Sequence, residues 1–272
     1  MSLLVADDLW AAVAPLLPPE PAKPKGGRPR ASDRAAPAGI LLVLRTGMQG
    51  REVPAALGCC GKTCLLAAAA RLARGRGLGG VASRLAGTPA AQRRRPGLVA
   101  RRARPRQRAC QKGGAATGPN PTDRGKPGTK RHLVTDARGT PLGLTPSGAN
   151  RHDSRMPAPT LDAVPGVRGG RRGRPRRRRP AKLHADDRYD HRRCRAECRA
   201  RGVAPRIARR GIESGERLGR HRWVVERTLA WPARFRRLTV RYERRADLHL
   251  ALATLACAII CLNQTRRFCP QF

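Results

Sequence analysis

The stretch 181-AKLHADDRYDHRRCRAECRARGVAPRIA-208 indicates the class of fold. Residues 181–186 are a short apolar run that ends in an acid, as a strand leading into a site would. Residues 188–201 form a basic run of helical character, and Gly202 after them suits the C-terminus of a helix. The apolar run 203–208 then predicts a second strand. Strand, helix and strand in this order predict a layered α/β domain.

The sequence on either side extends this α/β interpretation. Residues 130–135 and 141–146 predict the two strands of a hairpin, because 136-DARG-139 between them is rich in turn-forming residues. A further helix is expected from about residue 216. The apolar stretch 248–264 predicts a buried C-terminal helix, since it carries a His and falls short of the ~20 uncharged residues that cross a bilayer.

The first 64 residues predict a small helical region that binds DNA. Helices are expected over residues 7–17 and 32–46, with a linker rich in Pro, Gly and basic residues between them. The linker contains 27-GRPR-30, in which Arg28 and Arg30 would suit an arm that enters the minor groove of DNA. A solvated basic linker explains the same residues equally well.

The charge of the chain favours a nucleic-acid partner. The sequence has 58 Lys and Arg against 18 Asp and Glu, which gives a formal net charge of +40. Such a field collects polyanions, although codon usage in a GC-rich genome can also raise the Arg content. The run 168-RGGRRGRPRRRRP-180 predicts contacts with phosphates that carry no sequence preference.

The nine cysteines do not follow the usual spacing of a four-ligand zinc site. The pairs Cys194/Cys198 and Cys257/Cys261 are four residues apart, which predicts two small buried side chains on one helix face. The N-terminus lacks the basic region of a signal peptide and carries acids too early for one. We therefore expect a cytoplasmic protein with reduced thiols.

Two acids suit metal-dependent chemistry on DNA. Asp186 ends a predicted strand, where open α/β sheets place their sites, and Glu226 lies forty residues later in 220-RHRWVVERTLAW-231. Carboxylates on separate elements can hold Mg²⁺ and leave room for a substrate phosphate. An ordinary surface ion pair between Arg222 and Glu226, four residues apart on one helix, is the simpler explanation from spacing alone.

Longer motifs favour the metal site over the ion pair. The texts 118-GPNPTDRGKPGTKRHLVTDARG-139, 149-ANRHDS-154, 181-AKLHADDRYDHRR-193 and the run from Arg217 to Leu262 closely resemble bacterial insertion-sequence transposases of the DDE class. The opening residues 7–64 resemble the N-terminal segment of the same group. The resemblance implies a ribonuclease-H-like mixed sheet flanked by helices, preceded here by the small helical N-terminal region.

The resemblance also implies a function and roles for particular residues. Asp186 corresponds to the second aspartate of an Asp-Asp-Glu triad, Glu226 to its glutamate and Arg222 to the basic residue before it. The triad binds Mg²⁺ or Mn²⁺, cuts double-stranded DNA at terminal inverted repeats and joins the ends to a target. Active relatives are expected to work as oligomers. Arg236 and Arg237 are further candidates for contacts with DNA.

The family's first aspartate is missing from its expected place. It precedes a Lys-Gly-Gly that is present as 112-KGG-114, but residues 97–111 contain no acid. Residues 65–110 also have a composition unlike an enzyme domain, which suggests two compensating frameshifts; reading the gene in its other frames would refute this if no family-like text appeared. We expect a poorly ordered segment 65–111, an incomplete catalytic domain 112–272, and a transposase that is inactive. A DNA-binding remnant and a basic structural protein are the alternatives.

Overall fold

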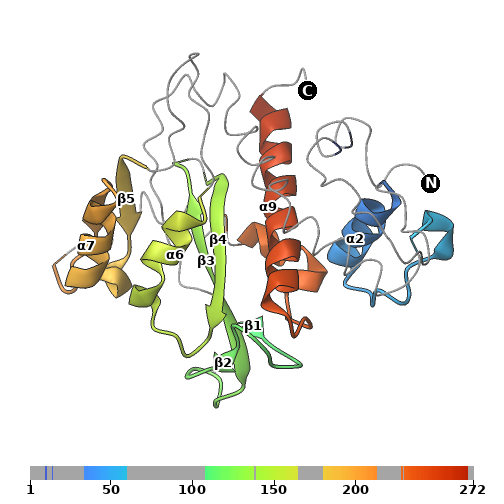
Figure 1. The fold of residues 1–272 in the computed structure, drawn as a ribbon, viewed down its shortest axis with the longest axis horizontal. Helices are drawn as coiled ribbons and strands as arrows, with labels where there is room; N and C mark the ends of the chain where they lie inside the picture. The colour runs from blue at the N-terminus through green and yellow to red at the C-terminus, as the bar shows by residue number, and fades with distance from the viewer. Residues whose placement is uncertain are drawn as a thin grey trace, which may run out of the picture.

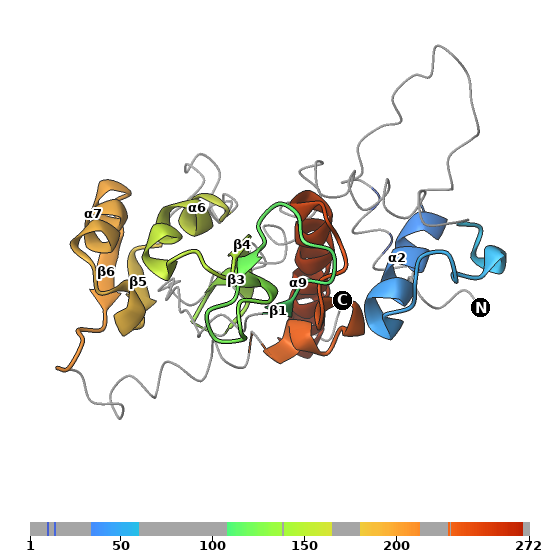
Figure 2. The ribbon, with the colours of Figure 1, turned by 90° about the horizontal axis from the view of Figure 1, so that it is seen from below.

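This computed structural model describes residues 34–59, 108–137, 139–164, 180–212, 228 and 230–268, together with Trp10 and Ala14. Within these ranges the chain forms a mixed α/β fold with two sheets. Figure 1 shows its elements as successive layers, and Figure 2 shows the same succession from below. The layers run from α7 (Arg192–Ala200) through the hairpin of β3 (Pro127–Thr135) and β4 (Pro141–Gly148) to α9 (Ala246–Phe268) and α2 (Ala35–Thr46).

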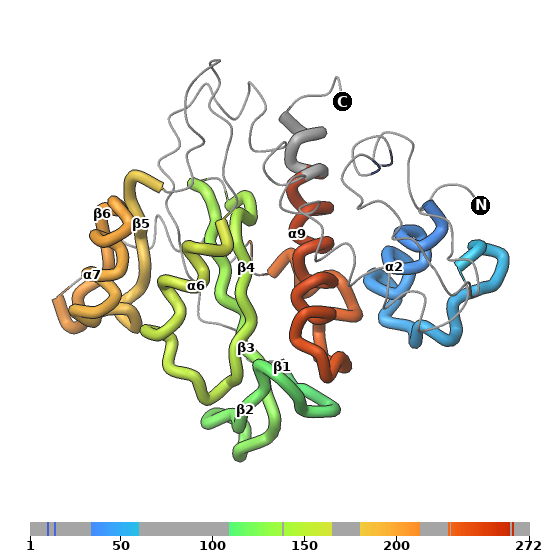
Figure 3. Tube along the Cα trace, viewed as in Figure 1, coloured from blue at the N-terminus to red at the C-terminus, as the bar shows by residue number. Residues whose placement is uncertain are grey.

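The hairpin of β3 and β4 confirms the strand pair predicted from the sequence, and Figure 3 traces it through the centre of the molecule. The strands are antiparallel, with a register shift between Val134 and Thr135. Asp136 closes the turn: its N–H donates to the Thr140 carbonyl at 3.0 Å, and its Oδ1 accepts from the Thr140 N–H at 2.8 Å. Two short strands, β1 (Arg108–Ala109) and β2 (Gly118–Pro119), pair with the beginning of β3.

The predicted strand, helix and strand of residues 181–208 are also confirmed. Strands β5 (Lys182–Ala185) and β6 (Ala204–Ile207) are parallel neighbours, and α7 connects them. The helix begins at Arg192, later than the expected residue 188, because the short 3-10 helix η4 (Asp187–Tyr189) intervenes. Burial of Tyr189 holds that turn against the sheet.

Helices α2 and α9 share the largest apolar core. Ile40 and Leu44 of α2 belong to one buried cluster with Leu252, Ala256 and Ile259 of α9. The sequence predicted α2 from residue 32, and the described helix begins at Ala35, so that Pro37 falls in its first turn. Proline is tolerated there because the first N–H groups of a helix have no partner within the helix. The helix predicted for residues 7–17 lies outside the described residues except for Trp10 and Ala14.

The predicted C-terminal helix is confirmed as α9, which begins at Ala246 and carries Asp247 as an acidic residue in its first turn. Across the described part of the chain, none of the helices combines the length and apolarity that a membrane crossing requires. The two cysteine pairs are buried free thiols, as their spacing predicted. Burial raises the pKa of the Cys198 thiol to about 11 and that of Cys257 to about 12, so both remain protonated at neutral pH.

The motif 112-KGG-114 has a structural reason in this fold. Gly114 has φ +110, and a Cβ built on it would overlap the backbone carbonyl of Arg244. Its neighbour Gly113 also has a positive φ, +63, but has nothing within 4 Å of the Cβ position. Gly114 therefore allows the loop before β2 to touch the segment that leads into α9.

Substitution of these two glycines should have unequal effects. Gly114→Ala is expected to lower the free energy of unfolding by about 3 kcal/mol, because it adds a backbone overlap to an unfavourable φ. Gly113→Ala is the matched control and should cost about 1 kcal/mol, the penalty of a left-handed alanine alone. Urea unfolding of both variants measures the difference, and equal midpoints would contradict the close approach to Arg244.

Candidate active site

Asp186 occupies the position that the sequence predicted for it. It directly follows Ala185, the last residue of β5, and precedes η4 in an extended conformation, with φ −75 and ψ 175. Its side chain is buried, with 8% of the residue exposed, and its carbonyl accepts a hydrogen bond from the Tyr189 N–H at 3.1 Å. A carboxylate at the carboxyl end of a parallel strand is held in place by the sheet.

The turn after Asp186 is held in place by an apolar cluster and by hydrogen bonds from Arg210. Tyr189 packs in an apolar cluster with Cys194 of α7 and Ile207 of β6. The N–H of Arg210 donates to Asp190 Oδ2 at 3.1 Å, and its Nε donates to the Asp187 carbonyl at 3.1 Å. The backbone on both sides of Asp186 is therefore anchored to elements that the strand pairing already places.

The carboxylate of the nearby Asp190 is engaged in hydrogen bonds that stabilise the fold. Arg195 Nη2 donates to Asp190 Oδ1 at 2.5 Å, and this bond, followed by the bond from the Arg210 N–H, lowers the pKa of the Asp190 carboxyl. Because both oxygens are engaged, Asp190 is a poor candidate for a metal ligand. Asp186 remains the acid in this turn that is both buried and placed at the strand end.

A second loop, 150-NRHDS-154, lies against the same turn, and sequence reasoning assigned it no role. Lys130 Nζ of β3 contacts Asp153 Oδ1 at 3.2 Å, and both side chains are almost fully buried. Arg193 of α7 donates to Ser154 Oγ at 2.8 Å. The loop thus joins β3 to α7 beside the site. Its only sequence signal was its place in the family-like text.

Two imidazoles meet where this loop reaches α7. The rings of His152 and His191 lie edge to face, with centroids 5.3 Å apart. Burial, and then the proximity of His191, lower the pKa of His152. The lowered pKa favours the neutral form of His152 near pH 7.

Several predicted site residues lie outside the described residues: Glu226, Arg222, Arg28 and Arg30. The structure therefore does not bring Asp186 and Glu226 together or separate them. Arg236 is exposed at the start of the 3-10 helix η5 (Arg236–Leu238), where DNA could reach it. Arg237 donates to Glu243 Oε1 at 3.0 Å and lies 4.7 Å above the Tyr242 ring, so its guanidinium already has protein partners.

Glu243 also belongs to a buried polar network that sequence reasoning missed. His249 Nε2 accepts from Arg131 Nε at 3.3 Å, and its Nδ1 faces Glu243 Oε2 at 3.4 Å. These partners fit a neutral ring whose proton is on Nδ1, and burial lowers the pKa of His249. Burial alone would raise the pKa of Glu243, but the bond with His249 and the charge of Arg237 outweigh it and lower that pKa. The network joins β3 to α9.

The described residues supply a candidate ligand for a metal centre, and not a complete centre. Among them, no group of three or more His, Cys, Asp or Glu side chains is close enough to hold a metal ion. Three acids among the described residues are buried, Asp153, Asp186 and Glu243. Asp153 is paired with Lys130, and Glu243 with Arg237, so Asp186 at the strand end is the candidate for the carboxylate oxygen that Mg²⁺ and Mn²⁺ prefer. A complete centre would need carboxylates from outside the described ranges.

A mixed α/β fold with an aspartate at a strand end, in a chain of this charge, fits the class of enzymes that transfer phosphoryl groups in DNA. A family profile described as "Transposase DDE domain" matches residues 101–261, and one described as "Putative transposase of IS4/5 family" matches residues 5–70. The chain therefore belongs to the DDE transposase family, whose members cut DNA and transfer strands in transposition, typically with a divalent metal.

The relatives point to one insertion element. The chain is 48% identical over 203 residues to a Burkholderia cepacia protein described as "Putative transposase for insertion sequence element IS402", covering 75% of this chain and 95% of that protein. It is also 48% identical over 64 residues to "Insertion element IS402 uncharacterized 16.2 kDa protein" of the same organism, covering 22% of this chain and 44% of that protein. No solved structure matches the chain.

Proposed function

We propose that this chain is a transposase copy that binds the ends of its own element but has lost its ability to cut them. The observation that carries the proposal is the absence of any acid in residues 97–111, ahead of 112-KGG-114, where the family's first aspartate is expected. Loss of one triad carboxylate removes a metal ligand. Additional arginine cannot replace it, because phosphoryl transfer depends on metal ions held in place.

The catalytic domain is proposed to span residues 112–272 and to have a ribonuclease-H-like architecture. The antiparallel hairpin of β3 and β4 and the parallel pair β5 and β6 support this fold. Within it, Asp186 and Glu226 would hold Mg²⁺ or Mn²⁺ weakly. The metal, when bound, would activate the attacking oxygen and stabilise the leaving one. Asp186 itself would serve as an oxygen ligand held by β5 and the η4 turn.

DNA binding is proposed to involve the helical region 1–64 and the basic residues around the catalytic domain. The candidates are Arg28, Arg30, Arg222, Arg236 and Arg237. Arg236 is exposed, whereas Arg237 would have to leave Glu243 in order to reach a phosphate. The expected substrates are the terminal inverted repeats and a target duplex, with the protein acting as an oligomer. Residues 65–111 are proposed as a degenerate segment between the two regions.

A second candidate function is that of a DNA-binding remnant that occupies element ends and represses transposition. The same missing acid favours it, because binding through arginines does not require the triad. The third alternative, a basic structural protein, would bind DNA without preference for the element. Sequence preference in binding therefore separates both transposase interpretations from the third.

Binding to the element end is tested against a scrambled duplex of equal length over a series of salt concentrations. We expect at least a hundredfold preference for the element end at physiological salt, together with a steep loss of affinity as salt rises. Arg28→Ala with Arg30→Ala should reduce the slope of log affinity against log salt by about 2. Arg199→Ala, an exposed change on α7, is the control. Equal affinity for both duplexes would contradict the proposal.

A further inference from the structure

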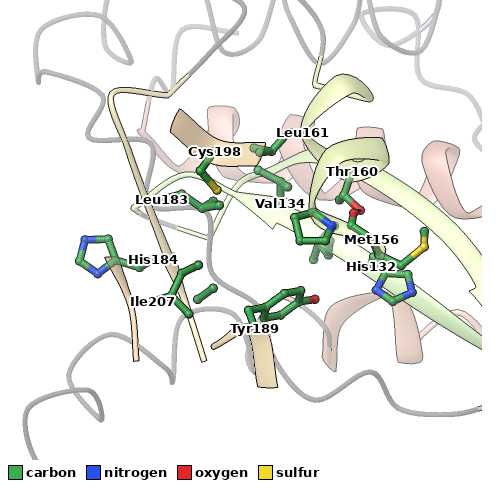
Figure 4. A pocket seen from close by; sticks show the side chains of 13 residues that line it. His132, Val134, Met156, Thr160, Leu161, Leu183, His184, Tyr189, Cys198 and Ile207 are labelled. Atoms are coloured by element: carbon green, nitrogen blue, oxygen red, sulfur yellow. Dashed lines mark hydrogen bonds between the residues drawn. The ribbon is translucent and has the colours of Figure 1, made fainter. Parts of the chain in front are cut away.

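The two tyrosines of the chain are placed in opposite ways. Tyr189 is buried, and its ring lines an apolar pocket next to α6 (Pro157–Asp162), where Figure 4 shows it near Ile207. Tyr242 is 40% exposed, and among the described residues only Ile212 is another large hydrophobic side chain at the surface. An aromatic ring contributes most to stability when it is buried, so the exposure of Tyr242 leaves a large flat group open to a binding partner.

The backbone on both sides of Tyr242 is fixed by the fold. The N–H of the preceding Arg241 donates to the Ala109 carbonyl at 2.9 Å, and its carbonyl accepts from the Gln111 N–H at 3.0 Å. The carbonyl of the following Glu243 accepts from Arg241 Nε at 2.9 Å. Both neighbours are buried, and an exposed residue between two buried ones is the alternation of an extended segment. The ring is therefore held at the surface and loses little freedom when it binds.

One face of the ring is already covered by an anchored cation. Arg237 Cζ lies 4.7 Å from the centroid of the Tyr242 ring, which is the geometry of a cation–π contact. Arg237 Nε donates to Glu243 Oε1 at 3.0 Å, and Glu243 Oε2 faces His249 Nδ1 at 3.4 Å. The guanidinium is thus held against the ring. The exposed surface of the ring therefore lies on its other face and along its edge.

The surroundings of the exposed ring are basic. Arg236 and Arg244 lie close to it in sequence and are exposed. Asp247, an exposed acid of the same segment, is engaged by Arg245, whose Nη2 donates to its Oδ2 at 2.6 Å. Proteins bind single strands with this combination, because a base stacks on the ring while arginines contact phosphates. A cationic ligand fits poorly, since a guanidinium already occupies one face of the ring. Duplex DNA keeps its base faces within the stack.

We propose that Tyr242 is a stacking site for an unpaired base of single-stranded DNA. Arg237 covers the opposite face of the ring without leaving Glu243. The exposed Arg236 and Arg244 contact the neighbouring phosphates. DNA is the expected strand because it is the substrate of the family. The inference depends on neither cleavage nor recognition of the element ends, because stacking uses the face of a base and every base has one.

The first test compares two single strands that carry the same number of phosphates. The full chain is titrated with a labelled strand of twelve thymidines and with an abasic strand of equal length, and fluorescence anisotropy measures both affinities. The thymidine strand should bind at least about fivefold more tightly, since stacking adds to a phosphate contribution that the two strands share. Equal affinities would overturn the proposal. This comparison needs no substitution, so a folding failure cannot imitate its result.

Substitutions then locate the contact. Tyr242→Leu should weaken binding of the thymidine strand by at least about fivefold, while binding of the abasic strand and of duplex DNA changes by less than about twofold. Tyr242→Phe keeps the ring and should bind both single strands as the unsubstituted chain does. Ile212→Ala, at the other exposed hydrophobic residue, is the matched control and should change neither affinity. No loss in Tyr242→Leu, or an equal loss on both single strands, would refute stacking on this ring.

A fluorescent base reports the stacking itself. A strand with 2-aminopurine at its centre should lose fluorescence when it binds the unsubstituted chain or Tyr242→Phe, because stacking on an aromatic ring quenches this base. Saturating Tyr242→Leu should leave most of the fluorescence. The same quenching in all three proteins would assign the base to a different ring and contradict the proposal.

Discussion

The purified chain, incubated with Mn²⁺ and DNA carrying the ends of its element, is expected to cut neither strand above the level of a sample containing a chelator. The ends can be read from the DNA that flanks the gene. The reason lies in the proposed metal centre: Asp186, its proposed ligand, is placed by β5, but residues 97–111 ahead of 112-KGG-114 contain no carboxylate that could serve as the first ligand of the triad. Removal of a triad carboxylate is expected to reduce the rate by orders of magnitude.

Two variants make this prediction sharper. Asp186→Asn and Glu226→Gln should leave the background level of cleavage unchanged, because there is no triad activity left for them to remove. DNA binding by both variants should stay within about twofold of the unsubstituted chain, which shows that each is folded. Cleavage by the unsubstituted chain that disappears in Asp186→Asn would contradict the predicted inactivity while supporting the role of Asp186. Cleavage that survives both substitutions would indicate a different site.

The local fold could be predicted from the sequence wherever the spacing of apolar residues and the turn-forming residues indicated the same element. The hairpin followed from two apolar runs around 136-DARG-139, and the parallel pair followed from the text between Ala181 and Ala208. The position of Asp186 then required only the rule that sites lie at the carboxyl ends of strands. The start of α7 was less predictable, because burial of Tyr189, a tertiary contact, creates η4 ahead of it.

The contacts around the site could not be predicted because they join residues far apart in the chain. Lys130 and Asp153 are an ordinary base and acid in the sequence, and only the fold buries them together. Arg237 and Arg241 are two of many arginines in a chain with a charge of +40, so an electrostatic argument treats both as DNA contacts or surface groups. In the structure one pairs with Glu243 and the other is entirely buried.

Arg241 is the side chain whose loss we expect to destabilise the fold most. It has no exposed surface, and its guanidinium donates to a set of backbone carbonyls and one hydroxyl. These acceptors are the carbonyls of Ala115 (2.6 Å), Glu243 (2.9 Å), Ala116 (3.0 Å) and Arg244 (3.3 Å), and Thr129 Oγ1 (3.3 Å). Its backbone also bridges β1, through Ala109 O at 2.9 Å and Gln111 N at 3.0 Å.

Arg241→Met is therefore expected to lower the free energy of unfolding by at least about 3 kcal/mol, because several buried carbonyls lose their donor and no water can replace it. Arg241→Lys should recover only a small part of this loss. It keeps the charge, but its compact ammonium cannot reproduce the planar fork that reaches acceptors on several sides. Urea unfolding followed by circular dichroism measures all of the variants.

The matched control is Arg244→Met, an arginine three residues along the chain whose side chain is exposed. It should change the unfolding free energy by less than about 0.5 kcal/mol, as is usual for surface substitutions. If Arg241→Met and Arg244→Met unfolded at the same urea concentration, the carbonyls around Arg241 would have to find other donors. The side chain of Arg241 would then contribute no more to stability than that of an exposed arginine, and it would not be the residue that joins β1, β3 and the segment before α9.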